Sequence, residues 1–444
     1  MRQLVYAGLW VFVLAPIASA QTKNWPQFRG AQADGLGEGD TLPDTWSTTE
    51  NVIWKADVPG WGWSSLVIWE NRIFVTAAVH EGSRDKMFAG GYPGGHVEPT
   101  DVHRWMTYCL DFDTGIILWQ REAYQGAPKQ PRHPRNSYAS ETPICDGERV
   151  YAYFANIGLF CYDMDGKPLW EKRWDSYPMR DGWNTGTSPV LHKDRLFIVN
   201  DNEKESFMVA LDKTTGEQAW RVERAERSNW ATPYVWENEL RTEIVTIGTN
   251  KARSYDLDGK VLWELTGTSG LVSQIPMSKH GLLYLGAGYH YGPLYAIRPG
   301  ASGDISLKDG ETSNQWIAWS QPRGSSIHPG YLISGERLFV LFDAGLLTCF
   351  HAKTGETIFP RQRLDTGGGR FYASPWAYNG KLFLLNEDGN TWVVEDGPKF
   401  NVIRKNRLDD FAWATPAIAR GSLFIRTYTK LYRLQKQANA ENKK

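Results

Sequence analysis

The sequence predicts an all-β fold built from one repeated, four-stranded unit, and three observations lead to this prediction. A Pro, replaced by Leu in the first copy, recurs at steps of 41 to 53 residues after a first step of 77. Each copy continues with short β-branched and aromatic runs that lack helical periodicity. A period of this length is typical of a propeller blade. We therefore predict an eight-bladed β-propeller of four-stranded antiparallel blades, anchored at Leu66, Pro143, Pro189, Pro233, Pro276, Pro329, Pro375 and Pro416.

The second and third strands of each unit have recognisable patterns. The third strands end in turns that contain Asp and Gly, as in CLDFDTGIILW from Cys109 and ALDKTTGEQAW from Ala210. Asp caps such a turn, and Gly adopts the positive φ that the turn requires. His351 stands where other units have Asp111 or Asp212, so we interpret it as a turn residue. The second strands are predicted at 72–78, 149–155, 195–201, 243–249, 282–288, 337–343, 381–387 and 422–428.

The fourth, outer strands carry a Trp and indicate how the ring closes. Trp119, Trp170, Trp220 and Trp263 fall at one position of the unit, where a flat ring can wedge between adjacent blades. The last unit has three strands and ends near residue 434. Residues 51–57 (NVIWKAD) look like an outer strand, with Trp54 in the Trp position. We predict that this segment pairs with residues 430–434 and closes the ring, which would remove open sheet edges.

The remaining segments flank this single domain, which spans residues 51–434. Residues 1–20 are typical of a secretory signal, with Arg2, an apolar stretch over 4–17 and the small residues 18–20 before the predicted cleavage site. An uncleaved membrane anchor is the alternative, and we expect no lipid anchor there because no Cys follows the apolar stretch. Residues 21–50 form an N-terminal arm, and 435–444 a disordered tail. The predicted location is periplasmic or secreted.

Composition excludes some partners and predicts free thiols. Lys and Arg number 49 against 50 Asp and Glu, so the chain has no long-range attraction for nucleic acid or an anionic membrane. After signal cleavage no segment is apolar for long enough to span a bilayer. Cys145 and Cys161 are expected on the first and third strands of one blade, ~9.5 Å apart and too distant for a disulfide. We expect Cys109, Cys145, Cys161 and Cys349 to be free.

Aromatic and polar residues gather in the loops before the first strands. These loops approach the central channel and share a face with the loops between strands two and three. Tyr372, Trp413 and Trp63 belong to consecutive blades across the closure point. Such rings, with a few Arg and Asn, suit a flat or sugar-like ligand; alternatively, they pack loop against loop and plug the channel mouth. A ligand platform needs at least two rings facing solvent. The predicted ligand-binding residues are Trp63, Arg135, Tyr138, Trp183, Asn184, Trp230, His328, Arg370, Tyr372 and Trp413.

Two insertions and several missing motifs complete the pattern. Residues 79–104 should overhang the same face, and His96, Glu98, Asp101 and His103 within them could bind a divalent metal or form a polar loop. We predict the polar loop and assign no metal site. Residues 298–315 should lie on the opposite face. The chain has no GxSxG, GxxxxGK[ST], HExxH or CxxCH motif, so no catalytic residue is assigned.

The units LDFDTGIILW, LDKTTGEQAW and YDLDGKVLW resemble the PQQ-like, quinoprotein-type propeller repeat, whose outer-strand Trp accompanies eight-bladed rings. The similarity covers nearly all of residues 50–434. The stretches NWPQFRGAQADG and RHPRNSYASETP look like those of a secreted subgroup of PQQ-binding-like repeat proteins. The resemblance therefore implies the same fold that the repeat predicts.

For function, the resemblance implies two classes. Non-catalytic periplasmic propellers, such as the BamB type of the outer-membrane barrel-assembly machine, bind proteins or ligands. Quinoprotein dehydrogenases hold pyrroloquinoline quinone and a metal ion over the channel, and alcohol-oxidising members typically stack the quinone on two adjacent cysteines, a pair that this chain lacks. We predict an exported, non-catalytic binding scaffold without a cofactor that recognises an envelope protein or a glycan. The alternative is a PQQ- and calcium-dependent dehydrogenase of alcohols or sugars, and a polysaccharide-binding module differs from the first class only in its ligand.

Overall fold

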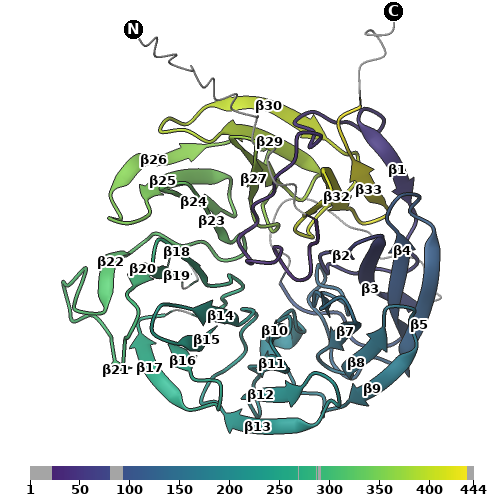
Figure 1. The fold of residues 1–444 in the computed structure, drawn as a ribbon, viewed down its shortest axis with the longest axis horizontal. Coiled ribbons are helices and arrows are strands. Elements are labelled where there is room, and N and C mark those ends of the chain that lie inside the picture. Colours follow the sequence, from purple (N-terminus) through teal and green to yellow (C-terminus); the bar gives the residue numbers. More distant parts are fainter. Residues whose placement is uncertain (1–22, 81–93, 269, 287, 289–291, 438–444) are drawn as a thin grey trace, which may run out of the picture.

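The computed structural model describes residues 23–80, 94–268, 270–286, 288 and 292–437. These residues form eight sheets arranged around a central channel (Figure 1), and the four strands of each blade pair antiparallel. Within the described part of the chain, the helical content is one 3-10 turn, η1 (Arg180–Gly182), between the second and third blades. The predicted eight-bladed, all-β fold is therefore confirmed.

The first four blades consist of consecutive strands. The first contains β2 (Val67–Trp69), β3 (Arg72–His80), β4 (His103–Asp111) and β5 (Ile117–Gly126). The second contains β6 (Ile144–Cys145), β7 (Arg149–Phe154), β8 (Gly158–Asp163) and β9 (Pro168–Lys172). The third contains β10 (Val190–His192), β11 (Arg195–Asn200), β12 (Phe207–Asp212) and β13 (Gln218–Glu223). The fourth contains β14 (Tyr234–Glu237), β15 (Thr242–Ile247), β16 (Lys251–Tyr255) and β17 (Val261–Thr266).

The last four blades include the insertion and the closing strand. The fifth contains β18 (Met277–Lys279), β19 (Leu282–Gly286), β20 (Leu294–Ile297) and β22 (Ile317–Gln321). The sixth contains β23 (Tyr331–Ser334), β24 (Arg337–Phe342), β25 (Leu346–His351) and β26 (Thr357–Arg363). The seventh contains β27 (Trp376–Tyr378), β28 (Lys381–Leu385), β29 (Asn390–Glu395) and β30 (Val402–Arg407). The eighth contains β31 (Ala417–Ala419), β32 (Ser422–Arg426), β33 (Leu431–Leu434) and, from the other end of the chain, β1 (Val52–Ala56). The insertion between β20 and β22 contributes β21 (Gly303–Asp304), which pairs in parallel with β17 and so lies on the outer edge of the fourth blade.

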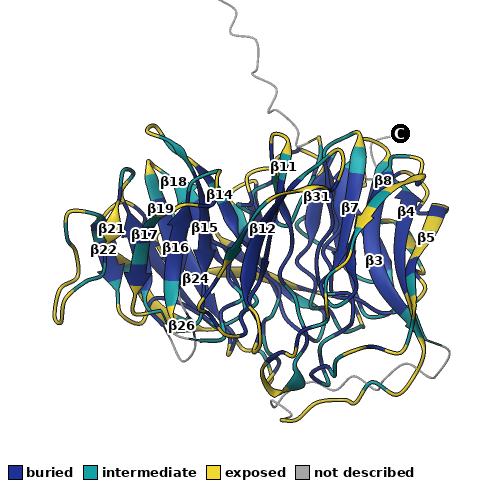
Figure 2. Ribbon diagram, turned by 90° about the horizontal axis from the view of Figure 1, so that it is seen from below, coloured by how far each residue is buried: buried dark blue, intermediate teal, exposed yellow. Residues whose placement is uncertain are grey.

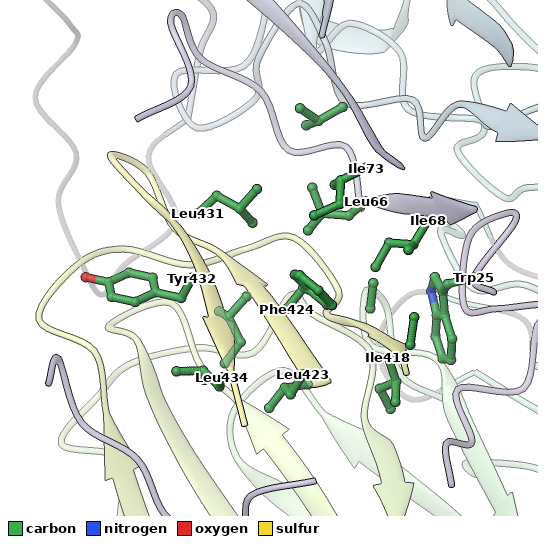
Figure 3. Close-up of a cluster of buried hydrophobic side chains, with 14 of the residues drawn as sticks. Trp25, Leu66, Ile68, Ile73, Ile418, Leu423, Phe424, Leu431, Tyr432 and Leu434 are labelled. Carbon is green, nitrogen blue, oxygen red and sulfur yellow. The ribbon is translucent and has the colours of Figure 1, made fainter. Parts of the chain in front are cut away.

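The core lies between the blades. The second and third strands of each blade are almost wholly buried, whereas the outer strands alternate between half-buried and exposed residues (Figure 2). Figure 3 shows the junction where the ring closes: Phe424 and Leu431 of the last blade lie toward Leu66 and Ile73 of the first. Burial of about 25 cal/mol per Å² of apolar surface at such junctions is what holds neighbouring blades together.

The outer-strand Trp residues of five blades each contact the next blade. The indole N–H of Trp119 donates to the carbonyl of Met164 at 3.0 Å, in the turn between the third and fourth strands of the next blade. The ring lies on Gly166 of that turn, which has a φ of 80° and would place a Cβ 2.6 Å from the indole. Glycine is required there both for the positive φ and for the contact. Trp54, Trp170, Trp220 and Trp319 repeat this arrangement over Gly115, Gly216, Gly259 and Gly355.

Strand β1 completes the last blade by antiparallel pairing with β33, in the register Val52 to Leu434 and Ala56 to Leu431. Its Trp54 donates to the carbonyl of Phe112 at 3.0 Å and thereby joins the last blade to the first. Closure thus uses the same Trp contact as four of the other junctions. The four cysteines are free and buried, as expected.

The N-terminal arm crosses the ring and closes one end of the channel. It pairs with the first blade at Trp25 and Ile68, and with the seventh at Leu36 and Ala377. Between these points it passes the centre of the ring, as the purple segment in Figure 1 shows. Arg29 is fully buried there, and its Nη2 donates to the carbonyl of Tyr331 at 2.8 Å. Burial lowers the pKa of Arg29 to about 10, against weaker raising effects of Asp34 and Tyr331.

In the part of the chain that the structure describes, no helix has the length and apolar character needed to cross a membrane.

Candidate functional site

The channel wall carries a hydroxyl residue directly before the anchor position of most blades. The backbone N–H of Ser65 donates to Oγ1 of Thr142 at 3.0 Å, and that of Thr142 donates to Oγ of Ser188 at 2.9 Å. Ser188 and Thr232 continue the series at 3.0 Å. In these bonds each hydroxyl accepts from the equivalent residue of the preceding blade, so the channel wall is held at one radius. The recurring Ser/Thr-Pro pairs are the sequence signal of this series.

The channel contains a cavity of about 530 Å³ that opens on the face of the loops before the first strands. Phe28 of the arm lines it at the other end. The cavity is therefore a blind cup rather than a through-channel. Besides the hydroxyl series, its lining includes Trp63, His133, Asn136, Trp183, Thr185, Trp230, Ser273, Ser326, His328, Asp343, Arg370, Tyr372 and Trp413.

One wall of the cavity is a stack of three rings from blades seven, eight and one. Tyr372 and Trp413 stack with centroids 4.0 Å apart and an interplanar angle of 17°. Trp413 and Trp63 stack at 5.1 Å and 20°. Both faces of Trp413 are thus covered by its neighbours, and the stack offers a ligand its edges and its outer rings. Such offset stacks contribute about 0.5–1.5 kcal/mol per pair beyond burial.

A second aromatic wall faces the first. Trp183 and Trp230 lie 6.0 Å apart at 36°, and the indole N–H of Trp230 donates to the carbonyl of Asn184 at 2.6 Å. These residues precede blades three and four, which lie across the ring from blades seven and eight. Trp183, Trp230, Tyr372 and Trp413 are each partly exposed and line the cavity. The two walls therefore line the same cavity from different blades.

The segment from 127 to 138 forms a strap over the mouth, fixed by a buried ion pair. Nη1 of Arg135 lies 3.2 Å from Oε2 of Glu387 and 3.0 Å from the hydroxyl of Tyr372. The exposed fractions of the Arg135 and Glu387 side chains are 1% and 0%. The indole N–H of Trp63 donates to the carbonyl of Arg135 at 2.8 Å. Burial raises the pKa of Tyr372, and the nearby Glu387 adds to this effect.

Seven of the ten predicted site residues line the cavity, and the other three lie behind its surface. Arg135 holds the strap, as described above. Tyr138 packs with Trp105, whose indole N–H donates to the Tyr138 carbonyl at 2.9 Å. Asn184 accepts a 2.6 Å hydrogen bond from Asn156 and has a positive φ of 62°. The three residues therefore shape the loops that carry the lining.

Asp343 and Ser326 belong to the site but were not predicted from the sequence. Oδ2 of Asp343 lies 3.2 Å from Nδ1 of His328, and its Oδ1 accepts 2.6 Å from Ser326 Oγ and 3.2 Å from the His328 backbone N–H. Burial alone would raise the pKa of Asp343, but His328 and these hydrogen bonds outweigh burial and hold it below its ordinary value. The carboxylate thereby fixes the His328 ring against the cavity wall.

Residues 81–93 of the first insertion lie outside the described residues, but all four residues of its metal candidate are described. Nε2 of His96 contacts Oε1 of Glu98 at 2.7 Å. His103 instead packs against His80 and Tyr138, each with a centroid distance of 5.0 Å. Among the described residues, no group of three His, Cys, Asp or Glu is placed to hold a metal ion.

Comparisons with known proteins agree with this fold. Residues 159–302 match a family model described as outer membrane protein assembly factor BamB. No curated protein sequence matches the chain. The partial family match and the similar solved structures therefore support a β-propeller fold of the PQQ-like type.

Three solved structures illustrate the likeness. BamB from Moraxella catarrhalis is 12% identical, covers 82% of this chain and 98% of its own, and has a TM-score of 0.53. A europium-containing methanol dehydrogenase is 10% identical over 91% of this chain and 89% of its own, with a TM-score of 0.60. A quinohemoprotein alcohol dehydrogenase from Comamonas testosteroni is 12% identical over 95% of this chain and 82% of its own, with a TM-score of 0.59. At these identities the likeness concerns the fold alone.

Proposed function

We propose that this PQQ-like propeller is an exported binding protein that holds part of a glycan in its cavity and has no chemistry of its own. The observation that carries the proposal is the blind cavity of about 530 Å³ between two facing aromatic walls. Cavities that bind small ligands usually measure ~300–1,000 Å³ and combine apolar walls with a few polar groups.

A sugar ring matches this arrangement because it has apolar C–H faces and a polar edge. The faces would pack on Trp183 and Trp230 on one side and on the Tyr372–Trp413–Trp63 stack on the other. Asn136 and His328, which also line the cavity, would receive the hydroxyl edge. A folded protein surface cannot enter such a cup, so an envelope protein would contact the rim loops instead. The cavity therefore favours the glycan over the protein partner.

The aromatic residues of the cavity lining would also suit the flat ring system of a quinone, which favours the alternative, a quinoprotein dehydrogenase. The residues present do not fit the quinone and calcium pair, however. Calcium takes six to eight oxygen ligands, whereas Asp343 is the one carboxylate residue in the described cavity lining, and its oxygens already accept hydrogen bonds from His328 and Ser326. The four cysteines lie on the first strand of the second blade and on three third strands, and none is in the cavity lining. We therefore derive no redox step.

Intrinsic tryptophan fluorescence tests the proposal, because four indoles line the cavity. The mature chain is titrated with a panel of mono- and oligosaccharides and, separately, with pyrroloquinoline quinone plus calcium. We expect a saturable change with a sugar that is lost in Trp230→Ala and kept in Trp316→Ala, a half-buried indole outside the cavity. A saturable response to the quinone, with dye reduction in the presence of an alcohol or sugar, would overturn the proposal in favour of the dehydrogenase. Failure of the whole sugar panel would also overturn it.

A further inference from the structure

The two charged side chains of the cavity lining differ in how far other groups of the protein neutralise them. Besides histidines, the described lining contains two charged residues, Asp343 and Arg370. The Asp343 carboxylate already accepts hydrogen bonds from Ser326 and from two groups of His328. Protein groups therefore already use most of the hydrogen-bond acceptor sites of this carboxylate, and few are left for a ligand.

Arg370 differs because no carboxylate neutralises its guanidinium within the described residues. Its backbone N–H donates to Oε1 of Glu387 at 2.9 Å, but that carboxylate forms its ion pair with Arg135. The Arg370 side chain itself has no hydrogen bond, ion pair or ring contact with any other described residue, while it is half-buried and lines the cavity. Two arginines thus share one carboxylate on this wall, which leaves one positive charge facing the cup.

The neighbouring His328 adds a second recognition element on the same wall. Its ring lies 4.9 Å from that of Tyr372, two residues after Arg370. Because Nδ1 is engaged by Asp343, Nε2 is the ring nitrogen left for a ligand. The side chain lines the cavity with an exposed fraction of 26%. It is therefore placed to form a hydrogen bond with a ligand hydroxyl.

On the basis of the proposed function, we infer that the sugar held in the cavity is a hexuronic acid unit, whose carboxylate binds Arg370 and whose hydroxyl forms a hydrogen bond with His328. The planar fork of arginine matches a planar carboxylate with two parallel hydrogen bonds. The aromatic walls contact the faces of the sugar ring, and Arg370 and His328 of blades six and seven contact its charged edge. This assigns to the site an acidic glycan rather than a neutral one.

Matched sugars test the inference. The mature chain is titrated by tryptophan fluorescence and calorimetry with glucuronate against glucose, and with galacturonate against galactose, and their short oligomers. We expect the acidic member of at least one pair to bind about tenfold tighter or more, since a charge-assisted hydrogen bond contributes that much. Arg370→Gln should remove this preference, and Arg370→Lys should keep part of it.

Controls separate the inference from protein damage. Arg404→Gln removes an exposed arginine on the outer strand of the same blade, and should leave the preference intact. His328→Phe should weaken the acidic and the neutral sugar alike, because a hydroxyl contact is common to both. Equal binding of the two members, a preference that survives Arg370→Gln, or tighter binding of a sulfated sugar would overturn the inference while leaving the glycan proposal standing. If no sugar of either kind binds, both fall.

Discussion

Removing the Glu387 carboxylate should cost far more than its small size suggests. Its side chain is fully buried, pairs with Arg135 at 3.2 Å and accepts the Arg370 backbone N–H at 2.9 Å. Glu387→Ala leaves the Arg135 charge buried beside Tyr372 without its carboxylate. Breaking a buried pair in this way costs about 3–5 kcal/mol. We expect a loss of that size in the free energy of unfolding.

The double variant Arg135→Met/Glu387→Leu separates the charge effect from simple loss of packing. Apolar replacement of a whole buried pair is often neutral, so the main remaining cost is the unmet Arg370 N–H, about 1 kcal/mol. Equilibrium urea unfolding followed by circular dichroism measures all three variants. Asp409→Ala is the control, because the Arg407–Asp409 pair is exposed and should contribute less than about 1 kcal/mol. A single-variant loss below about 1 kcal/mol, or a double variant as unstable as Glu387→Ala, would refute the reasoning.

Three further predictions concern stability. A chain that begins at residue 60 lacks β1 and should melt well below the mature chain, because the last blade loses its outer strand; equal melting temperatures would count against ring closure by this segment. Gly166→Ala should lose more unfolding free energy than Gly380→Ala, because both glycines have positive φ but the added methyl meets the Trp119 indole only at Gly166; equal losses in urea unfolding would contradict the Trp wedge. The depressed pKa of Asp343 means that its stabilising contribution is complete above the ordinary carboxyl pKa of about 4 and is lost as the pH falls through the lower folded value. Thermal unfolding from neutral to acid pH should therefore show a weaker acid dependence in Asp343→Asn, and an unchanged profile would exclude this contribution.

Local sequence patterns predict most of the fold because the residues that define a blade lie close together in the sequence. The Pro anchors, the Asp–Gly turns and the outer Trp lie within one unit, and the structure explains the recurrence of Trp and Gly by a contact between one blade and the next. The Trp at position 54 could be interpreted in the same way, although its partner strand β33 lies near the other end of the chain.

The site is less predictable because its contacts join distant loops. Position within the unit places Trp63, Tyr372 and Trp413 correctly at the cavity. The same reasoning cannot show that Arg135 forms an ion pair with Glu387 whereas Arg370 forms none with a described residue, since both arginines occur in loops of one class. The path of the arm, with Phe28 at the base of the cavity, also has no repeat to indicate it.

The position of β1 also has a consequence for biosynthesis. A ribosome makes this strand before any of the eight sheets, yet its hydrogen-bonding partner β33 is made after the other seven blades. Seven blades can therefore stack in order while β1 has no partner. The eighth sheet becomes complete only when β1 and β33 pair, so a nascent chain released before β33 is made would leave the ring open.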